Sequence, residues 1–357
     1  MIVNNSQDLN TLLSLVLDKL KDDDRFESIL DHGPLEFNVF SITFWVKFAG
    51  SSGHTSVYVK IPKYIFYDKN INFLSPITKF DIELAVNESN SLDYLSKNWD
   101  ESNNVFFIRK LAFIKEFNAL VTERIIGTFF FEEYRKHDFS KKNMNQDHHK
   151  VIKGLYNFGK SLKYFHSKSS TKSEFKAYEI IKKINIYSNY LKISGVSPKY
   201  LKQISNKLKK NTEFHNPTFI AKNLKGIDIR QIFITNNHDL VIIDPGKISE
   251  GYIEIDIARF IVTCRILYWG TIKIFFQKVP NESFENNFLD GYYGRNHQYS
   301  KSLNLLIIKE YFKQWKVGHS ALRERGWPIL FKFIFKKIYM DPFYKRLILI
   351  EFEKLNQ

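Results

Sequence analysis

Strand-like and helix-like residue patterns occupy different parts of this chain. Residues 35–61 and 105–126 carry runs of β-branched and aromatic residues around polar turns, which predicts antiparallel strands. After Gly127 the apolar residues recur mostly at helical spacing, apart from a strand, turn and strand at 231–244. This separation predicts an α+β fold in which a strand-rich part precedes a mainly helical part.

The length of 357 residues favours two lobes over one small core. Residues 1–124 are expected to form a small lobe, in which an antiparallel sheet is joined by helices at 6–21 and 79–97. Residues 125–357 are expected to form the larger, mainly helical lobe. Within it, the Lys- and Ser-rich stretch at 167–174 is predicted to be a surface loop.

The excess of basic over acidic residues favours binding partners that carry negative charge. The chain has 53 Lys and Arg against 38 Asp and Glu, a net charge of +15, which favours a nucleotide, a phosphorylated sugar, nucleic acid or an acidic membrane surface. Solubility alone would also explain this charge. The single cysteine, Cys264, excludes a disulfide framework. Because we find neither a secretory signal nor a run of about 20 apolar residues, we expect a cytoplasmic protein.

The C-terminal part combines basic and aromatic residues. Residues 301–357 contain twelve Lys or Arg against five Asp or Glu, interleaved with Phe, Tyr and Trp. A helix pair of this composition can lie on an anionic membrane surface, here the inner face, or it can pack as a helical core with its lysines in water. The sequence contains no recognised nucleic-acid-reading motif. It also lacks the motifs of serine hydrolases, zinc proteases and P-loop proteins.

Four sequence pieces that suit phosphoryl transfer occur in a meaningful order. Lys60 lies in the strand-like "VYVKIPK", Glu88 in the helical "NESNSLDYL", and "VTERIIG" follows a strand; much later "VIIDPGK" places Asp244 at the end of a buried strand. A strand lysine oriented by a helix carboxylate can hold nucleotide phosphates, and an aspartate beside them can hold Mg²⁺. Each piece alone has an ordinary structural reading, but their joint order favours this chemistry.

Together with "GLYNFGKSLKYFH" and "EIDIARFI", these pieces resemble the aminoglycoside phosphotransferase and choline kinase-like family from about residue 35 to 262. The resemblance implies a bilobal protein-kinase-like fold, with a small antiparallel-sheet N-lobe and a larger, mainly helical C-lobe. It also implies a phosphotransferase that uses ATP or GTP with Mg²⁺ and acts on an alcohol group.

The resemblance assigns roles to particular residues. Lys60 would contact the nucleotide phosphates and Glu88 would orient it, with Glu83 as a rival partner. Asp244 would bind the metal and Asp256 would brace the catalytic loop. The segment whose backbone would meet the nucleotide base comprises Thr122, Glu123, Arg124 and Ile125.

The expected catalytic loop, H-G-D-x-x-x-x-N, is replaced by "NLKGIDIRQIFIT". Alignment of the apolar strand puts Gln231 at the Asn position and Gly226 at the Asp position, whereas taking Asp228 as the catalytic residue puts Phe233 at the Asn position. We predict a shortened loop in which Asp228 is the base and Gln231 is a weak metal ligand. The alternative is a degenerate loop in a catalytically inactive pseudokinase.

Two further cations flank this predicted site. Arg230 and Lys247 could contact a transferring phosphoryl group or an anionic acceptor. The alternative is that both are solvated surface charges. The predicted function is nucleotide- and Mg²⁺-dependent phosphoryl transfer to a hydroxyl of a small molecule or saccharide, with a sugar or surface glycan as one candidate. The alternatives are a nucleotide-binding or regulatory pseudokinase, and a basic peripheral membrane or nucleic-acid binding protein.

Overall fold

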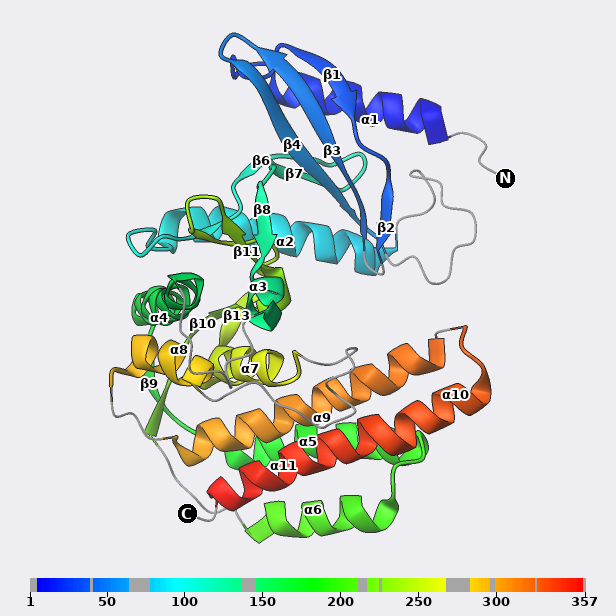
Figure 1. Cartoon of the computed structure of the whole chain (residues 1–357), viewed down its shortest axis with the longest axis vertical. Coiled ribbons are helices and arrows are strands. Elements are labelled where there is room, and N and C mark those ends of the chain that lie inside the picture. The colour runs from blue at the N-terminus through cyan, green and yellow to red at the C-terminus, as the bar shows by residue number, and fades with distance from the viewer. Residues whose placement is uncertain are drawn as a thin grey trace. The chain divides into compact units, whose positions relative to one another are not determined.

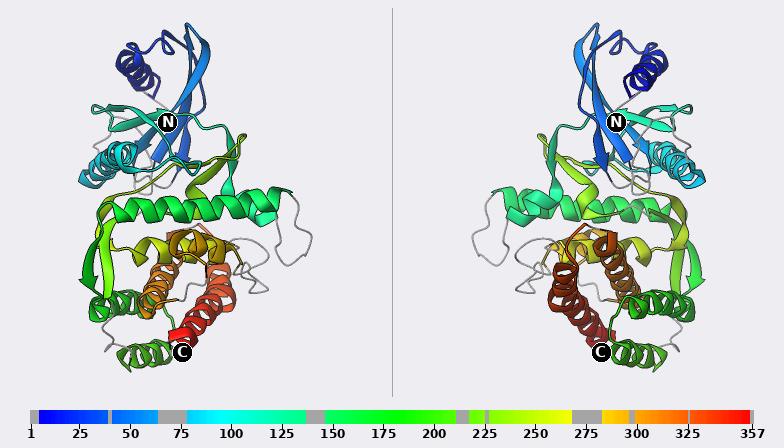
Figure 2. Two further views of the ribbon diagram at one scale, coloured as in Figure 1. Left: turned by 90° about the vertical axis from the view of Figure 1, so that its left-hand side faces the viewer. Right: turned by 90° about the vertical axis from the view of Figure 1, so that its right-hand side faces the viewer.

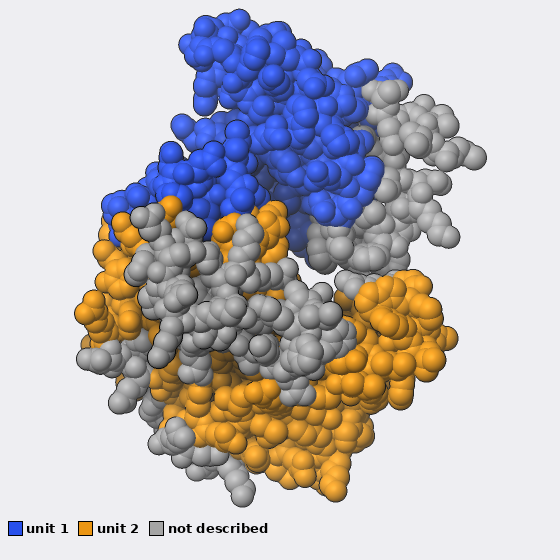
Figure 3. Space-filling model, viewed as in Figure 1, with its two compact units in different colours: residues 1–128, 224–226, 233–248 blue, residues 129–223, 227–232, 249–357 orange. Residues whose placement is uncertain are grey.

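The structure is a computed structural model in which the chain divides into two compact units (Figure 3). The first unit comprises Met1–Thr128, Leu224–Gly226 and Phe233–Ile248, and the second comprises Phe129–Asn223, Ile227–Ile232 and Ser249–Gln357. The residues that the structure describes are 5–38, 41–63, 78–136, 146–210, 217–224, 227–267, 283–295, 299–324 and 326–355.

The first unit is built around a sheet with the strand order β1-β3-β4-β7-β6, in which β2 also pairs with β3 (Figure 1). The predicted hairpin is present as β3 and β4, which pair antiparallel from Ser41 and Pro62 to Gly50 and Gly53. The elements are α1 (Asn5–Leu20), β1 (Ser28–His32), β2 (Glu36–Asn38), β3 (Ser41–Gly50), β4 (Gly53–Pro62), α2 (Lys79–Asn98), β6 (Lys110–Ile114) and β7 (Ala119–Glu123).

The leading helix packs on one face of this sheet. Leu12, Val16 and Leu20 of α1 share a buried cluster with alternate residues of β4, among them Val57 and Val59. Helical spacing puts the three helix residues on one stripe, and the period of two puts the strand residues on one face. Figure 2 shows α1 alongside these strands. The helix predicted at 6–21 is therefore present.

The stretch "VFFIRKLAFI", which the pattern predicts as one strand, is two strands in different sheets. β5 (Val105–Phe107) pairs in parallel with β12 (Leu240–Ile242), whereas β6 pairs antiparallel with β7. The change of partner falls at two adjacent residues. The Ile108 amide donates to the carbonyl of Ile242, while the Arg109 carbonyl accepts from the Glu123 amide.

A second sheet explains why residues 233–248, which the sequence assigns to the second lobe, cluster with the first unit. Its strand order is β5-β12-β11-β8, where β8 is Gly127–Phe129 and β11 is Ile232–Thr235. Gly127 is required at this point because a Cβ there would lie 2.2 Å from the Ile234 carbonyl oxygen. The hairpin predicted at 231–244 is therefore paired into strands from the N-terminal part of the chain.

The second unit is mainly helical, with a small sheet of order β13-β10-β9. The stretch at 167–174, predicted to be a loop, contains β9, because its backbone pairs with β10 although its side chains give no alternating apolar signal. The elements are α3 (Phe130–Lys136), α4 (Gln146–Ser167), β9 (Thr171–Glu174), α5 (Ala177–Ile193), α6 (Pro198–Lys210), β10 (Pro217–Leu224), η2 (Ile229–Gln231), β13 (Ile248–Tyr252), α7 (Glu254–Arg265), α8 (Ser283–Tyr293), α9 (Lys301–Glu324), α10 (Ile329–Ile334), the π-helix η4 (Phe335–Met340) and α11 (Asp341–Leu355).

The C-terminal helices α9 and α11 form part of the core of the second unit. Figure 2 shows them side by side, and Tyr311 and Trp315 of α9 are fully buried. Trp315 stacks on Tyr344 of α11 with the ring centroids 5.9 Å apart. No helix among the described residues is long and apolar enough to span a bilayer.

Candidate functional site

Lys60 lies on the face of the first-unit sheet opposite to α1. Val57, Val59 and Ile61 of β4 point into the cluster beneath α1, so the period of two turns Lys60 to the other face. In the sheet, Lys60 lies opposite Thr43 of β3 and Leu120 of β7. Since β4 is the central strand of this order, the backbone that carries Lys60 is paired on both sides.

The helix α2 supplies the partner of this lysine. The Lys60 Nζ atom donates to both carboxylate oxygens of Glu88, each at 2.8 Å, and the Glu88 side chain is only 8% exposed. The helix begins with a capping box between Thr78 and Asp81, which fixes its start and thereby the position of Glu88. Glu83, the rival in the sequence, is exposed to solvent.

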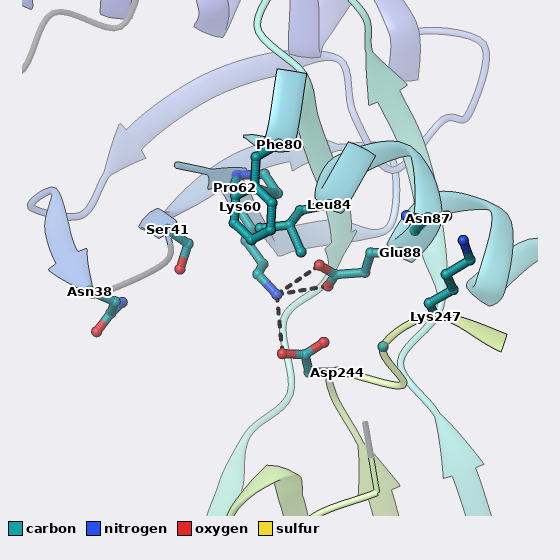
Figure 4. A pocket seen from close by; sticks show the side chains of 11 residues that line it. Asn38, Ser41, Lys60, Pro62, Phe80, Leu84, Asn87, Glu88, Asp244 and Lys247 are labelled. Atoms are coloured by element: carbon teal, nitrogen blue, oxygen red, sulfur yellow. Dashed lines mark hydrogen bonds and ion pairs between the residues drawn. The ribbon is translucent and has the colours of Figure 1, made fainter. Parts of the chain in front are cut away.

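Asp244 is the second carboxylate beside Lys60. Its Oδ2 atom lies 3.5 Å from the Lys60 Nζ atom, and its side chain is 34% exposed. Figure 4 shows the lysine ammonium between the carboxylates of Glu88 and Asp244. Asp244 lies two residues after the end of β12, so the parallel pairing of β12 with β5 determines where this carboxylate lies. The three side chains carry a net charge of −1 when all are ionised.

This proximity shifts the pKa values of the buried pair. Burial raises the pKa of Glu88 to about 7, because Lys60 only partly offsets the loss of solvation and Asp244 adds a like charge. Burial alone would lower the pKa of Lys60, but Glu88 and Asp244 raise it well above its usual range. Lys60 is therefore a permanent cation at neutral pH, while Glu88 titrates near neutrality.

A cavity of about 730 Å³ opens beside these three side chains. Its described lining comes from the first unit, and Figure 4 shows the lining side chains. Apolar Pro62, Phe80 and Leu84 form part of the wall, and Lys247 adds a second cation to the lining. The remaining lining residues are Asn38, Ser41, Asn87 and Gly246. A cavity with apolar walls and a few converging charges is typical of a small-molecule site.

Ser91 is a supporting residue that the sequence analysis missed. Its Oγ atom accepts a hydrogen bond of 3.2 Å from the Ile248 amide, which ties α2 to the segment that follows Asp244. Glu88 and Ser91 are three residues apart and so lie on neighbouring positions of one helix surface. A serine in a polar stretch gives no sequence signal of this contact, because its partner is a backbone amide far along the chain.

The predicted base-contacting residues, at the end of β7 and just after it, are engaged within the first unit. Thr122 is buried opposite Tyr58, and Glu123 lies 3.6 Å from Arg25. The Arg124 guanidinium lies over the ring of Trp45, and Ile125 packs against a buried cluster that includes Leu120. None of the four is among the described residues that line the cavity, so a nucleotide contact at this segment stays a prediction.

Asp228 and Arg230 form a local pair in the second unit. Asp228 is buried, and its carboxylate caps η2 by accepting from the Arg230 backbone amide at 3.0 Å. Its two oxygens also accept from the Arg230 side chain, through Nε at 2.8 Å and through Nη2. Arg230, predicted as an anion contact, is therefore paired with the predicted base. Gln231 ends η2, and Gly226 lies outside the described residues.

Asp256 is fully buried near the start of α7 in the second unit. Its Oδ2 atom lies 3.1 Å from Nε2 of His166, whose Nδ1 atom lies 2.7 Å from the Tyr292 hydroxyl. This chain of contacts joins α7 to α4 and α8. The predicted bracing of the catalytic loop stays a prediction. His166 was missed because a histidine at the end of an apolar helical pattern resembles an ordinary helix end.

A Mg²⁺ ion would need oxygen ligands from the residues around Lys60. Among the described residues, no group of three or more His, Cys, Asp or Glu side chains is arranged to hold a metal ion. Mg²⁺ in nucleotide sites is commonly held by one or two carboxylates together with phosphate oxygens and water. Asp244, a partly exposed carboxylate in a cavity wall, fits that mode.

Neither a protein-family model nor a curated protein sequence matches the chain. Solved structures do match over nearly its whole length. The ethanolamine kinase of Plasmodium vivax has a TM-score of 0.56 at 12% identity, covering 99% of this chain and 92% of that chain. A choline kinase from Cryptosporidium parvum Iowa II has a TM-score of 0.52 at 11% identity, covering 96% and 95%.

The gentamicin complex of APH(2″)-IIa has a TM-score of 0.51 at 12% identity, covering 97% of this chain and 95% of that chain. At such identities the likeness establishes the fold alone. The predicted protein-kinase-like α+β fold is confirmed, and these structures are of the kinds that the sequence motifs resemble.

Proposed function

We propose that this protein is a nucleotide-dependent phosphotransferase that moves the terminal phosphoryl group of ATP or GTP to a hydroxyl of a small molecule. One observation carries the proposal: the Lys60 ammonium lies between the carboxylates of Glu88 and Asp244 at the wall of a cavity of about 730 Å³. The similar solved structures include a choline kinase, an ethanolamine kinase and a gentamicin complex. A saccharide acceptor remains one of the candidates to be tested.

In this proposal Lys60 binds and orients the nucleotide phosphates. Its two hydrogen bonds to Glu88 fix the direction of the ammonium, so little ordering is left to occur when the phosphates arrive. The contact to Asp244, at 3.5 Å, is longer and is the one that a phosphate oxygen would replace. Asp244 would then be available to hold Mg²⁺, which when bound would neutralise phosphate charge. Gln231 is the proposed second ligand.

Asp228 is the proposed base for the acceptor hydroxyl. The Arg230 side chain donates to both of its carboxylate oxygens, so turning this guanidinium away would leave more of the carboxylate's lone pairs to accept a hydroxyl proton. Arg230 is half-exposed, with 55% of its side chain in contact with solvent, so it has room to turn away. Once released, its guanidinium can stabilise the charge of a transferring phosphoryl group.

The same pair favours a second candidate, a nucleotide-binding protein without transfer activity. If the bonds between Arg230 and Asp228 are permanent, Asp228 serves only to cap η2, and Gly226 at the aligned Asp position has no side chain to act as a base. Both candidates require a nucleotide at Lys60, and they differ only in whether a phosphoryl group moves.

Thermal unfolding with ATP or GTP, with and without Mg²⁺, tests nucleotide binding. Saturating nucleotide should raise the melting temperature of the wild type by roughly 2 °C or more. Lys60→Met should abolish the shift, whereas Lys115→Met, a matched change at an exposed turn, should retain it. No shift with either nucleotide would contradict both candidates.

Transfer of labelled phosphate to a panel of amines bearing hydroxyls, aminoglycosides and sugars separates the two candidates. The phosphotransferase should label at least one acceptor, and Asp228→Asn should lower kcat by roughly 100-fold or more, the scale of a lost general base. Nucleotide binding without any labelled acceptor would favour the inactive protein. An Asp228→Asn variant as active as the wild type would refute the role of Asp228.

A further inference from the structure

A short helical segment of the second unit exposes many large apolar side chains. We call these residues the α10 surface; they are Ile329, Leu330, Phe331, Phe333, Ile334 and Ile338. Their exposed fractions range from 36% to 86%, and no residue of α10 is buried. Soluble monomers rarely expose so many neighbouring apolar side chains without a function for them. Figure 1 shows α10 following α9 at the start of the final helical stretch.

The α10 surface is held in place by its lysines. The Lys332 Nζ atom donates to the Arg323 carbonyl at the end of α9. Lys336 and Lys337 donate to the carbonyls of Ser194 and Gly195, directly after α5. These contacts place cations at the C-terminal ends of two helices, where the helix dipoles favour them. The segment is therefore anchored, although its apolar side chains face solvent.

Further apolar and aromatic residues adjoin the α10 surface. Ile193, which directly precedes the carbonyl bound by Lys336, is 87% exposed. Trp327 makes edge contacts with Phe331 and Phe335, at centroid distances of 5.1 and 5.9 Å. Trp and Phe beside aliphatic residues are favoured at the boundary between lipid headgroups and acyl chains.

The charged residues in the sequence around the α10 surface are all positive. Residues 325–340, "RGWPILFKFIFKKIYM", contain one Arg and three Lys and no Asp or Glu. The next acidic residue, Asp341, is buried and bonded to Trp315 and His319, and its Oδ2 atom lies 3.8 Å from the Lys337 ammonium. An apolar surface within a positive segment suits an anionic occupant. A second copy of the chain would bring the same positive segment, on a protein of net charge +15, and would be repelled.

We propose that the α10 surface docks onto an anionic lipid bilayer. The Ile, Leu and Phe side chains would enter the outer part of the acyl region, with the lysines at headgroup level. The proposed contact is interfacial, since it uses the side chains of one short helical segment. The buried side chains of α9 and α11 fit a helical core, whereas the exposed α10 surface is the part that would meet a membrane.

Co-sedimentation of the full chain with vesicles tests this proposal. Partitioning onto vesicles with a one-third share of phosphatidylglycerol should exceed that onto pure phosphatidylcholine by on the order of tenfold or more, as expected for a few lysines near a charged surface. The excess should shrink markedly between about 0.1 M and about 1 M salt.

Phe331→Ser with Phe333→Ser should lower the partitioning onto anionic vesicles by roughly tenfold, since two half-exposed rings leave the interface. A matched pair of changes at exposed apolar positions elsewhere, Phe37→Ser with Ile186→Ser, should leave it unchanged. Because all four side chains are exposed, each variant should keep the melting temperature of the wild type, which is measured alongside.

Three outcomes would overturn the proposal. The first is that the wild type does not bind anionic vesicles. The second is that the Phe331→Ser, Phe333→Ser variant binds them as well as the wild type does. The third is a dimer, detected by light scattering, that this variant abolishes while vesicle binding is absent; that result would assign the α10 surface to self-association.

Discussion

Replacing Glu88 by Gln should remove a pH-dependent loss of stability while it damages the proposed site. The pKa of Glu88 is raised from its usual 4.5 to about 7 by burial and by Asp244, so the folded protein holds a proton there more tightly than the unfolded chain does. The corresponding stabilisation is fully present below about pH 4.5 and is lost as the pH rises through about 7. The full loss corresponds to about 3 kcal/mol of the free energy of unfolding.

The neutral amide that Glu88→Gln introduces cannot ionise, so the stability of this variant does not fall as the pH rises through about 7. Its free energy of unfolding relative to wild type should therefore rise by about 2 to 3 kcal/mol between about pH 5 and about pH 8. Urea denaturation of both proteins across this range measures the difference. Glu83→Gln, at an exposed position of the same helix, should show no such rise.

The reasoning would be refuted by a stability difference between Glu88→Gln and wild type that does not change with pH. It would also be refuted by a difference that falls as the pH rises, which would mean that Lys60 more than offsets the burial of Glu88. The effect on nucleotide binding is measured separately. Because Glu88→Gln removes the carboxylate that orients Lys60, the variant should bind nucleotide on the order of tenfold less tightly. Functional sites that need a buried charge often lower the free energy of unfolding of the protein.

Three further changes test other parts of the structure. Gly127→Ala should destabilise the protein by about 2 to 4 kcal/mol in urea denaturation, because its Cβ would meet the Ile234 carbonyl; Gly326→Ala, with open space around it, is the control. Arg230→Met should lower kcat for transfer, because it removes the guanidinium that would stabilise the transferring phosphoryl group, and an unchanged or raised kcat would contradict that role. His166→Leu should lower the free energy of unfolding by about 2 to 4 kcal/mol, since it removes two buried hydrogen bonds; a loss below about 0.5 kcal/mol would contradict this.

Local patterns were sufficient to predict the parts of the site that depend on one element. The alternation along β4 separates Lys60 from Val57 and Val59, and the helical spacing of α2 places Glu88 within one element. The family resemblance suggested the pair of Lys60 and Glu88 and left Glu83 open as a rival. The same resemblance, which rests on the order of the motifs, implied the protein-kinase-like fold.

Contacts between distant segments were beyond such patterns. Nothing in "VFFIRKLAFI" shows that Phe107 pairs with Ile242 while Lys110 pairs with Thr122, because both halves are equally strand-like. The capping of η2 by Asp228 was also missed, because the same residue types suit a catalytic loop. The strand β9 was missed because it is held by backbone pairing, and its mostly exposed polar side chains show no strand-like sequence pattern.

The parallel pairing of β5 with β12 also has a consequence for how the protein is made. Phe107 and Ile242 are about 135 residues apart, so on the ribosome β5 emerges well before its partner strand. At typical elongation rates the nascent chain waits on the order of ten seconds with that edge unpaired. The first unit therefore cannot finish folding during synthesis of its own N-terminal part. Chaperones that shield exposed strand edges should act in this interval.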